Sequence, residues 1–266
     1  MENMHTILNK AEADNIVKMD LSTVKTLQIG YHGESIYLEM IDGDELILKE
    51  YIGYSAYEYL AKVTANRFKT TIRYGRREKV DTKAFIEIFL PRNWHGEFLV
   101  YTQYGHISCK DCIALDRFAA ESSEGSLNFN EILSPRIRLA SSSNSVFLEK
   151  AIGFTDIHTT SGNILAGDIN GGAKLESSTG KIDASFSGLN NVIECNTLSG
   201  TMDLHFTEDC NINVDGITKT GEIDSEIDGI EVRAKAGKAK IVTGQHGKKP
   251  FQNVKLSTIN GSIHLC

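Results

Sequence analysis

Apolar and polar residues alternate along most of the chain, and the alternation restarts at a nearly constant interval. The segment 159–165, TTSGNIL, returns at 177–183 as SSTGKID. Related segments recur as far as residue 266, with a period of about twenty residues. A drifting period of this size is typical of solenoid proteins, in which each repeat stacks on the one before it.

One glycine marks each repeat and serves as its reference position. Apolar residues follow it at the second place, and a serine or threonine precedes it by three places in eight of nine repeats. This alternation predicts a strand, a sharp corner and a second strand in every coil. We expect the glycine to have a positive φ, which asparagine also tolerates, and the hydroxyls to bond the corner amides. The reference positions are Gly105, Gly125, Asn144, Gly162, Gly180, Gly200, Gly221, Gly237 and Gly261.

The predicted fold is all-β, a parallel β-helix or solenoid with about 20 residues per coil. Residues 1–95 are less regular, and we expect them to form a β-rich cap on the repeats of 96–266, either as a separate part or in one continuous domain. A Greek-key sandwich also has many short strands. It does not explain why the same residue types return at the same offset.

The order of motifs resembles one bacterial family. Leu27-x-Ile29, DGDELIL at 42–48, IEIFLP at 86–91 and the repeated Ser/Thr-x-x-Gly-x-Ile are similar to the putative adhesin, or toast-rack, β-strand-repeat family, over about residues 20–266. The resemblance implies a right-handed parallel β-helix and a role at the bacterial cell envelope or in its stress response. It supplies no catalytic residues.

The charge balance excludes some partners. The chain has 28 Lys and Arg against 35 Asp and Glu, a net charge of −7, which argues against binding nucleic acid. Residues 51–82 are rich in tyrosine and basic residues, and they form either a nucleic-acid surface or a solvated sheet face. No apolar run is long enough to span a membrane, and residues 1–5 do not resemble a signal peptide. We therefore expect a cytoplasmic protein, or an envelope-associated one if an anchor lies outside this sequence.

The five cysteines indicate a structural role. Cys109 and Cys195 occupy inward positions of the repeat, where cysteine behaves as a small apolar residue. Cys109 and Cys112 have the C-x-x-C spacing of half a zinc or redox site, but no second pair follows. We expect reduced thiols, no metal and no cofactor.

One group of carboxylates is a candidate site. Asp183, Asp203 and Asp224 stand three places after the reference glycine in consecutive repeats. Stacked coils would bring such positions within roughly 4.8 Å of each other, where carboxylates repel unless a cation or a proton lies between them. This stripe could bind calcium or hydrolyse a glycosidic bond. The alternative is a hydrated outer surface.

The sequence therefore predicts a non-enzymatic scaffold for binding or assembly, with a protein or glycan partner. The alternative function is a carbohydrate-active or cation-binding protein that uses the acidic stripe. Residues 262–266 form a last strand with no visible cap, which predicts a homodimer through the C-terminal coil.

Overall fold

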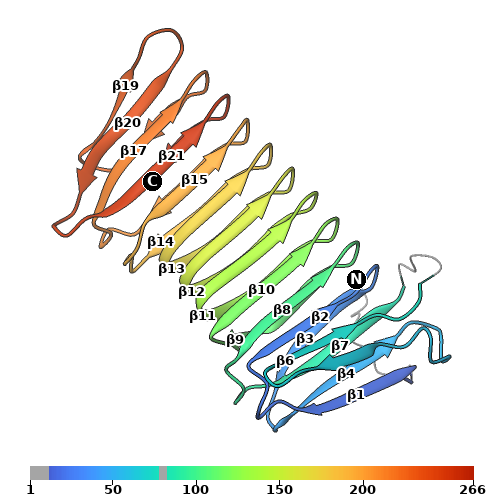
Figure 1. The fold of residues 1–266 in the computed structure, drawn as a ribbon. Helices are drawn as coiled ribbons and strands as arrows, with labels where there is room; N and C mark the ends of the chain where they lie inside the picture. The colour runs from blue at the N-terminus through green and yellow to red at the C-terminus, as the bar shows by residue number, and fades with distance from the viewer. Residues whose placement is uncertain (1–11, 78–82) are drawn as a thin grey trace.

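The protein is a flattened β-solenoid whose coils stack side by side along one axis (Figure 1). The computed structural model describes residues 12–77 and 83–266, and these residues form strands and turns with no helix. Each coil contributes one strand before the corner glycine and one after it. We call the two resulting layers the upstream sheet and the downstream sheet.

The regular coils occupy the middle of the chain. Their strands are β8 (Glu97–Thr102), β9 (Ile107–Ala114), β10 (Arg117–Ser122), β11 (Leu127–Ser141), β12 (Val146–Thr159), β13 (Ile164–Ser177), β14 (Ile182–Ser187), β15 (Ile193–Thr197) and β16 (Met202–Phe206). All neighbours are parallel, and β11, β12 and β13 each run through both sheets. Apolar residues of the repeat pair in register and are fully buried, as at Leu127, Val146 and Ile164. The predicted solenoid and its buried face are confirmed, while the handedness stays a prediction.

The serine or threonine of each corner lies inside the solenoid, and most of these hydroxyls hold adjacent coils together. Ser122 Oγ donates to the carbonyl oxygen of Gly105 at 2.9 Å and accepts from the amide of Gly125 at 2.8 Å. Ser177 bonds Gly162 and Gly180 in the same way. The predicted buried hydroxyls are found at Thr102, Ser122, Ser141, Thr159, Ser177, Thr197, Thr218 and Thr258. Thr159 and Thr197 differ from the prediction, because their hydroxyls donate to the carbonyl oxygens of Gly162 and Gly200 instead of accepting from a corner amide.

The prediction that the corner glycines have a positive φ is wrong. Only Gly237 among the reference positions has a positive φ, and Asn144 does not. The other glycines are needed because the coils approach closely. A Cβ on Gly125 would lie 1.7 Å from the carbonyl oxygen of Gly105, and one on Gly180 would lie 2.0 Å from that of Gly162. A side chain at either position would therefore force the coils apart.

The N-terminal end is capped by strands that do not follow chain order. They are β1 (Asn15–Asp20), β2 (Thr26–Gly30), β3 (Ser35–Ile41), β4 (Glu45–Tyr51), β5 (Lys62–Ala65), β6 (Lys69–Arg73) and β7 (Phe85–Pro91). The coil β2–β3 lies between β6–β7 and β8–β9, parallel to both. Antiparallel β5, β4 and β1 close the two sheets. The division at residues 95 and 96 stays a prediction, although the β2–β8 hydrogen bonds cross it.

The C-terminal end is also built out of order. Its strands are β17 (Ile212–Thr218), β18 (Ile223–Ser225), β19 (Ile230–Ala234), β20 (Lys240–His246), β21 (Gln252–Thr258) and β22 (Ile263–Leu265). The coil β21–β22 lies between β15–β16 and β17–β18, and the antiparallel hairpin β19–β20 completes the upstream sheet.

Two predictions about this end are therefore wrong. Gly237 lies in the connection between the antiparallel strands β19 and β20 and is no corner of a coil. The C-terminal coil does not present a free end to a second copy, because β22 is already paired on both sides. The structure thus gives no support to a homodimer through that coil.

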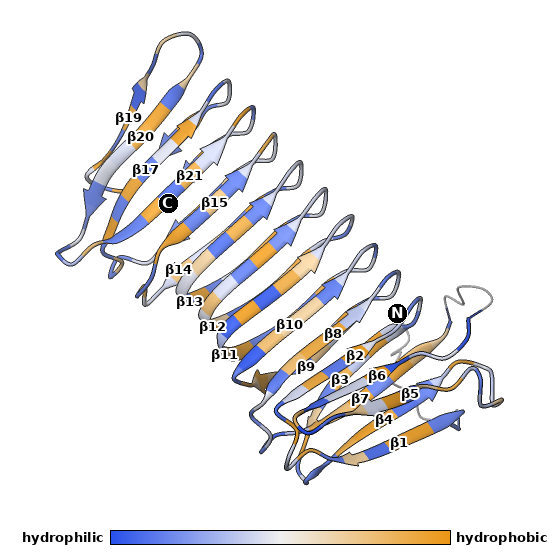
Figure 2. Ribbon diagram, in the orientation of Figure 1, coloured by the Kyte–Doolittle hydropathy of each residue, from blue (hydrophilic) through white to orange (hydrophobic). Residues whose placement is uncertain are grey.

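Figure 2 shows apolar and polar residues alternating along the strands of both sheets. A single apolar core runs between the sheets from Leu21 to Leu265. Cys109, Cys195 and Cys210 are buried in this core as free thiols, which confirms the inward positions predicted for the first two. In the part of the chain that the structure describes, no helix is long and apolar enough to cross a membrane.

Candidate functional site

The acidic stripe lies on the downstream sheet, but its members are not consecutive. Asp183 on β14 and Asp203 on β16 are direct neighbours in register. Asp203 and Asp224 are both paired with His264 of β22, which separates them. The sequence could not show this, because the inserted coil comes last in the chain.

A lysine already occupies the space between the two adjacent carboxylates. Lys181 Nζ lies 2.8 Å from Asp183 Oδ2 and 2.6 Å from Asp203 Oδ2. These hydrogen bonds, with Asp183 contributing most, raise the pKa of Lys181 above its ordinary value. Within residues 12–77 and 83–266, no group of three or more His, Cys, Asp or Glu side chains is arranged to hold a metal ion. Ligand binding at Asp183, Asp203 and Asp224 stays a prediction.

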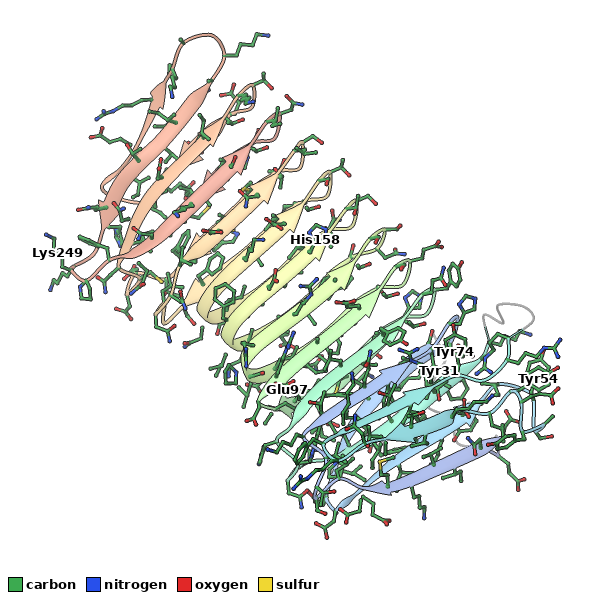
Figure 3. The ribbon with its side chains drawn as sticks, viewed as in Figure 1. Tyr31, Tyr54, Tyr74, Glu97, His158 and Lys249 are labelled. Atoms are coloured by element: carbon green, nitrogen blue, oxygen red, sulfur yellow. The ribbon has the colours of Figure 1, made fainter. Side chains whose placement is uncertain are left out.

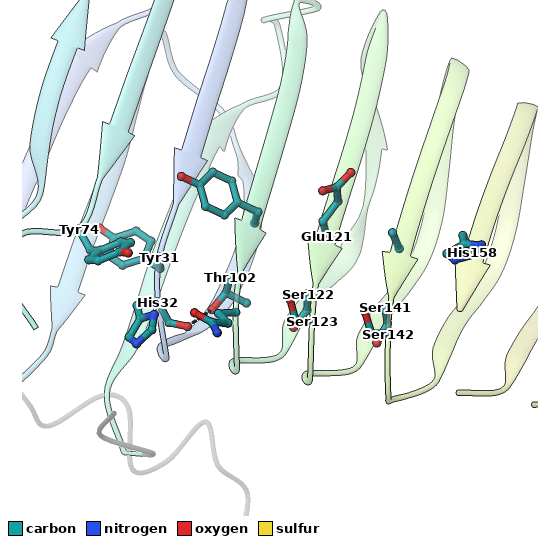
Figure 4. Close-up of a pocket in the computed structure, with 13 residues that line it drawn as sticks. Tyr31, His32, Tyr74, Thr102, Glu121, Ser122, Ser123, Ser141, Ser142 and His158 are labelled. Carbon is teal, nitrogen blue, oxygen red and sulfur yellow. Dashed lines mark hydrogen bonds between the residues drawn. The ribbon is translucent and has the colours of Figure 1, made fainter. Parts of the chain in front are cut away.

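A groove crosses the outer face of the upstream sheet beside the corners. It has a volume of about 370 Å³ and extends from Tyr74, after β6, to His158 on β12 (Figure 4). Figure 3 shows the side chains over the whole rod and labels Tyr31, Tyr74 and His158 along this edge. Between the two ends, Tyr101, Glu121 and Ala140 pair in register and line the groove.

Two small residues shape the groove. Gly30 pairs with Tyr101, and a Cβ on Gly30 would lie 2.0 Å from Cζ of the tyrosine ring. The half-buried ring of Tyr101 therefore leans across the backbone of β2 and leaves its outer side to the groove. Ala140 has only a methyl group between Glu121 and His158, which are both exposed. Because this methyl group is much smaller than the side chains on either side, the surface is hollowed between Glu121 and His158.

Aromatic rings form one end of the groove. The ring of His32 stacks on Tyr74, with centroids 5.7 Å apart, and meets Tyr104 edge-on at 5.2 Å. Beneath them Tyr31 is buried and donates to Glu50 Oε1 at 3.1 Å. Burial, followed by the nearby Glu50 carboxylate, raises the pKa of Tyr31 well above its ordinary value, so its hydroxyl stays protonated. The aromatic end is therefore held by a fixed buried support.

The other end of the groove is polar and nearly balanced in charge. Arg138 Nε lies 3.3 Å from Glu121 Oε1, and His158 Nδ1 lies 3.7 Å from Glu176 Oε2. The hydroxyls of Ser122 and Ser141 are used inside the corners. The hydroxyls open to a ligand are instead those of the exposed Ser123 and Ser142.

Sequence reasoning missed this groove, although part of its signal was present. Tyr101, Glu121, Ala140 and His158 each precede a corner hydroxyl by one place, so they share one repeat offset. Since residues at this offset are aromatic, acidic, small and basic in turn, the offset could have been identified as a row of outward-facing side chains. The contact of Gly30 with Tyr101 could not be found, because it depends on the inserted coil β2–β3.

Comparison with known proteins identifies the fold. The family model described as Toastrack DUF4097 matches residues 62–265. A solved structure of a putative adhesin from Bacteroides fragilis is similar, with a TM-score of 0.52 and 15% identity over 95% of this chain and 97% of that one. A putative lipid binding protein from Parabacteroides distasonis has a TM-score of 0.54 and 14% identity over 95% and 96%. At such identities these structures show the fold alone. No curated protein matches the sequence.

Proposed function

The chain belongs to the Toastrack family, and from this premise we propose that it is a binding scaffold whose groove on the upstream sheet holds an extended glycan. The observation that carries the proposal is the ring of Tyr101, which leans on Gly30 with its outer side toward the groove. Sugars present apolar C–H faces and many hydroxyls, so they fit an aromatic surface bordered by polar groups.

The charges support a neutral ligand. The carboxylate of Glu121 is paired with Arg138, and His158 with Glu176. Among the described residues that line the groove none is a lysine or arginine, so a phosphate group would find no such cation among them. Hydroxyls and an amide, from Ser123, Ser142 and Gln103, are suited to hydrogen bonds with sugar hydroxyls.

The shape supports an extended ligand. The groove follows the axis of the solenoid across β6, β2, β8, β10, β11 and β12. Five spacings between neighbouring strands give a length of about 24 Å. A linear oligosaccharide lying along the axis would place successive units over successive coils.

The state of the acidic stripe supports the proposal of binding without catalysis. Lys181 bridges Asp183 and Asp203, so this carboxylate pair is not free as glycoside hydrolysis would need it to be. The Bacteroides fragilis protein is described as a putative adhesin. Attachment to a glycan of the bacterial envelope is the form of binding that we propose here.

The experiment tests binding of bacterial envelope oligosaccharides on an array, followed by calorimetry of each hit. Gly30→Ala should displace the ring of Tyr101 without removing it, and Tyr101→Ala should remove it. Each should weaken binding about tenfold, the effect expected for one lost aromatic contact. The control is Tyr37→Ala, because Tyr37 packs on Phe85 in the downstream sheet, away from the groove. Equal affinity in all three variants, or no bound glycan, would refute the proposal.

A further inference from the structure

The N-terminal tip of the rod carries a concentrated positive charge. Residues 62–77 contain six lysines and arginines and no acidic residue, in a chain whose net charge is −7. They form β5, β6 and the residues after them, which we call the basic hairpin. It closes the upstream sheet, because β6 is the only described strand that pairs with β5.

Four of the six positive charges of the basic hairpin are exposed and available to a partner, whereas Arg77 is nearly buried and pairs with Glu34 and Glu50. Every residue from 62 to 69 is exposed, as is Arg73. Among the described residues, Lys62, Arg67, Lys69 and Arg73 make no ion pair. Lys62 also lies directly opposite Arg73 in the ladder, an arrangement of like charges that destabilises a hairpin. An anionic partner would remove that repulsion.

Aromatic side chains flank these charges. Phe68, at the turn of the basic hairpin, is 46% exposed and lies beneath Lys25 and Arg67, whose charged groups are 4.9 and 5.0 Å from its centroid. At the opposite end of β6, the amide of Arg76 donates to the carbonyl oxygen of Glu58. This bond holds the neighbouring loop, in which Tyr57 is 82% exposed, against the hairpin.

We propose that the basic hairpin docks the rod, end on, to the surface of an anionic lipid bilayer. Lysine and arginine are attracted to anionic headgroups, while exposed aromatic rings favour the interface between headgroups and acyl chains. A polyanion in solution would use the charges but would leave Tyr57, Phe68 and the 43% exposed Val63 in water. The combination of charge and exposed apolar area therefore favours a membrane surface.

The inference does not depend on the proposed function, because none of Lys62, Arg67, Lys69 and Arg73 lines the glycan groove, although Tyr74 of the basic hairpin forms its end. From Tyr74 the groove leads along the side of the rod to His158, away from the edge formed by β5. In a docked molecule the groove would therefore lead away from the bilayer.

A plainer explanation of these charges is protection of an edge strand, since lysines on an edge prevent pairing with other chains. The hairpin β19–β20 at the other end provides the matched comparison. It carries exposed Lys235 and Lys238, and its sequence has no phenylalanine, tyrosine or tryptophan. Edge protection predicts the same behaviour at both ends, whereas docking predicts binding through the basic hairpin alone.

The experiment is co-sedimentation of the full chain with vesicles of phosphatidylcholine and phosphatidylglycerol in equal parts, and with vesicles of phosphatidylcholine alone. The wild type should bind the anionic vesicles, and added salt should weaken the binding. The triple variant Lys62→Gln, Lys69→Gln, Arg73→Gln should bind about a hundredfold more weakly, at about fivefold for each charge. Phe68→Ser should also weaken binding, whereas Lys235→Gln with Lys238→Gln should not. Circular dichroism verifies that each variant is folded.

Several outcomes would overturn the proposal. These are no preference for anionic vesicles, equal binding by the triple variant and the Lys235/Lys238 control, or binding of heparin or single-stranded DNA without binding of vesicles. A triple variant that self-associates but still binds vesicles normally would assign the charges to edge protection.

Discussion

Ser122 donates a hydrogen bond of 2.9 Å to the carbonyl oxygen of Gly105, which stands 17 residues earlier in the chain and one coil away. The same hydroxyl accepts from the amide of Gly125 within its own corner. One side chain thus satisfies a buried donor and a buried acceptor from two coils. Since neither group can reach water, the hydroxyl is required for the coils to stack.

Removing that hydroxyl should destabilise the whole rod. We expect Ser122→Ala to lower the free energy of unfolding by about 1–3 kcal/mol, because two buried polar groups lose their partner. Ser123→Ala is the matched control, since Ser123 is the next residue and is exposed. It should change stability by less than about 0.5 kcal/mol. Urea denaturation measures both, and equal effects would show that the corner bonds contribute little.

Stability should also fall at high pH because two core thiols resist ionisation. Burial, the largest cause in each case, raises the pKa of Cys109 from 9.0 to about 12 and raises that of Cys195 as well. The folded protein therefore holds these protons more tightly than the unfolded chain does. Their contribution is fully present below pH 9.0 and is lost as the pH rises toward 12, by about 1.4 kcal/mol per thiol for each pH unit.

The variant Cys195→Ala isolates this effect, because it removes one of the two thiols. Urea unfolding of the variant and the wild type across this pH range should show a shallower decline for the variant. Cys266→Ala is the control, since Cys266 is exposed. An identical decline in Cys195→Ala and the wild type would contradict the prediction.

The acidic stripe should respond to calcium only when its lysine is removed. Lys181→Gln leaves Asp183 and Asp203 side by side without a cation, so we expect calcium to raise the melting temperature of this variant. Adding Asp203→Asn should abolish that response. Without calcium, the stability of Lys181→Gln should change by no more than about 1 kcal/mol, since the ion pairs are exposed. A calcium response of the wild type that depends on Asp203 would instead support the stripe as a cation site.

The inserted C-terminal coil should be replaceable by a separate peptide. A chain ending at residue 251 lacks β21 and β22, which leaves β15 and β16 with unpaired edges, and we expect it to aggregate. Adding the peptide 252–266 should restore a monomer in light scattering, because both sides of the gap are preformed.

Matched peptides test whether the added segment fills that gap. Leu256→Ala should weaken rescue at least about thirtyfold, because Leu256 is buried in the core. Ile259→Ala should have little effect, since Ile259 is 38% exposed. Rescue that is equally strong with both peptides would mean that the peptide does not occupy the native position.

The coils could be predicted from the sequence because the residue pattern that forms each coil is local and recurs in every repeat. The pattern of Leu127, Val146 and Ile164 follows from one buried face, and the hydroxyls follow from one corner. Apart from Gly237, the corner glycines were located correctly but explained wrongly, since close contact between coils and a positive φ select the same residue. Gly125 shows the difference, because only the structure reveals the carbonyl above it.

The order of the coils could not be predicted from the period. The repeat pattern predicts which residue types each coil packs against its neighbours. It does not predict which coil of the chain is that neighbour. His264 therefore appeared remote from Asp203 and is its direct neighbour. The groove depends on the same kind of information, because Gly30 and Tyr101 meet only through the inserted coil at the other end.

The coil β21–β22 has a consequence for synthesis on the ribosome. Strands β17 to β20, which cap the rod, are translated before the coil on which they pack. Strands β17 to β20 must therefore either stay undocked until β21 and β22 are made, or first pair with β15 and β16 and later be displaced by β21 and β22. Co-translational folding of this chain cannot be a simple addition of coils in the order of their synthesis.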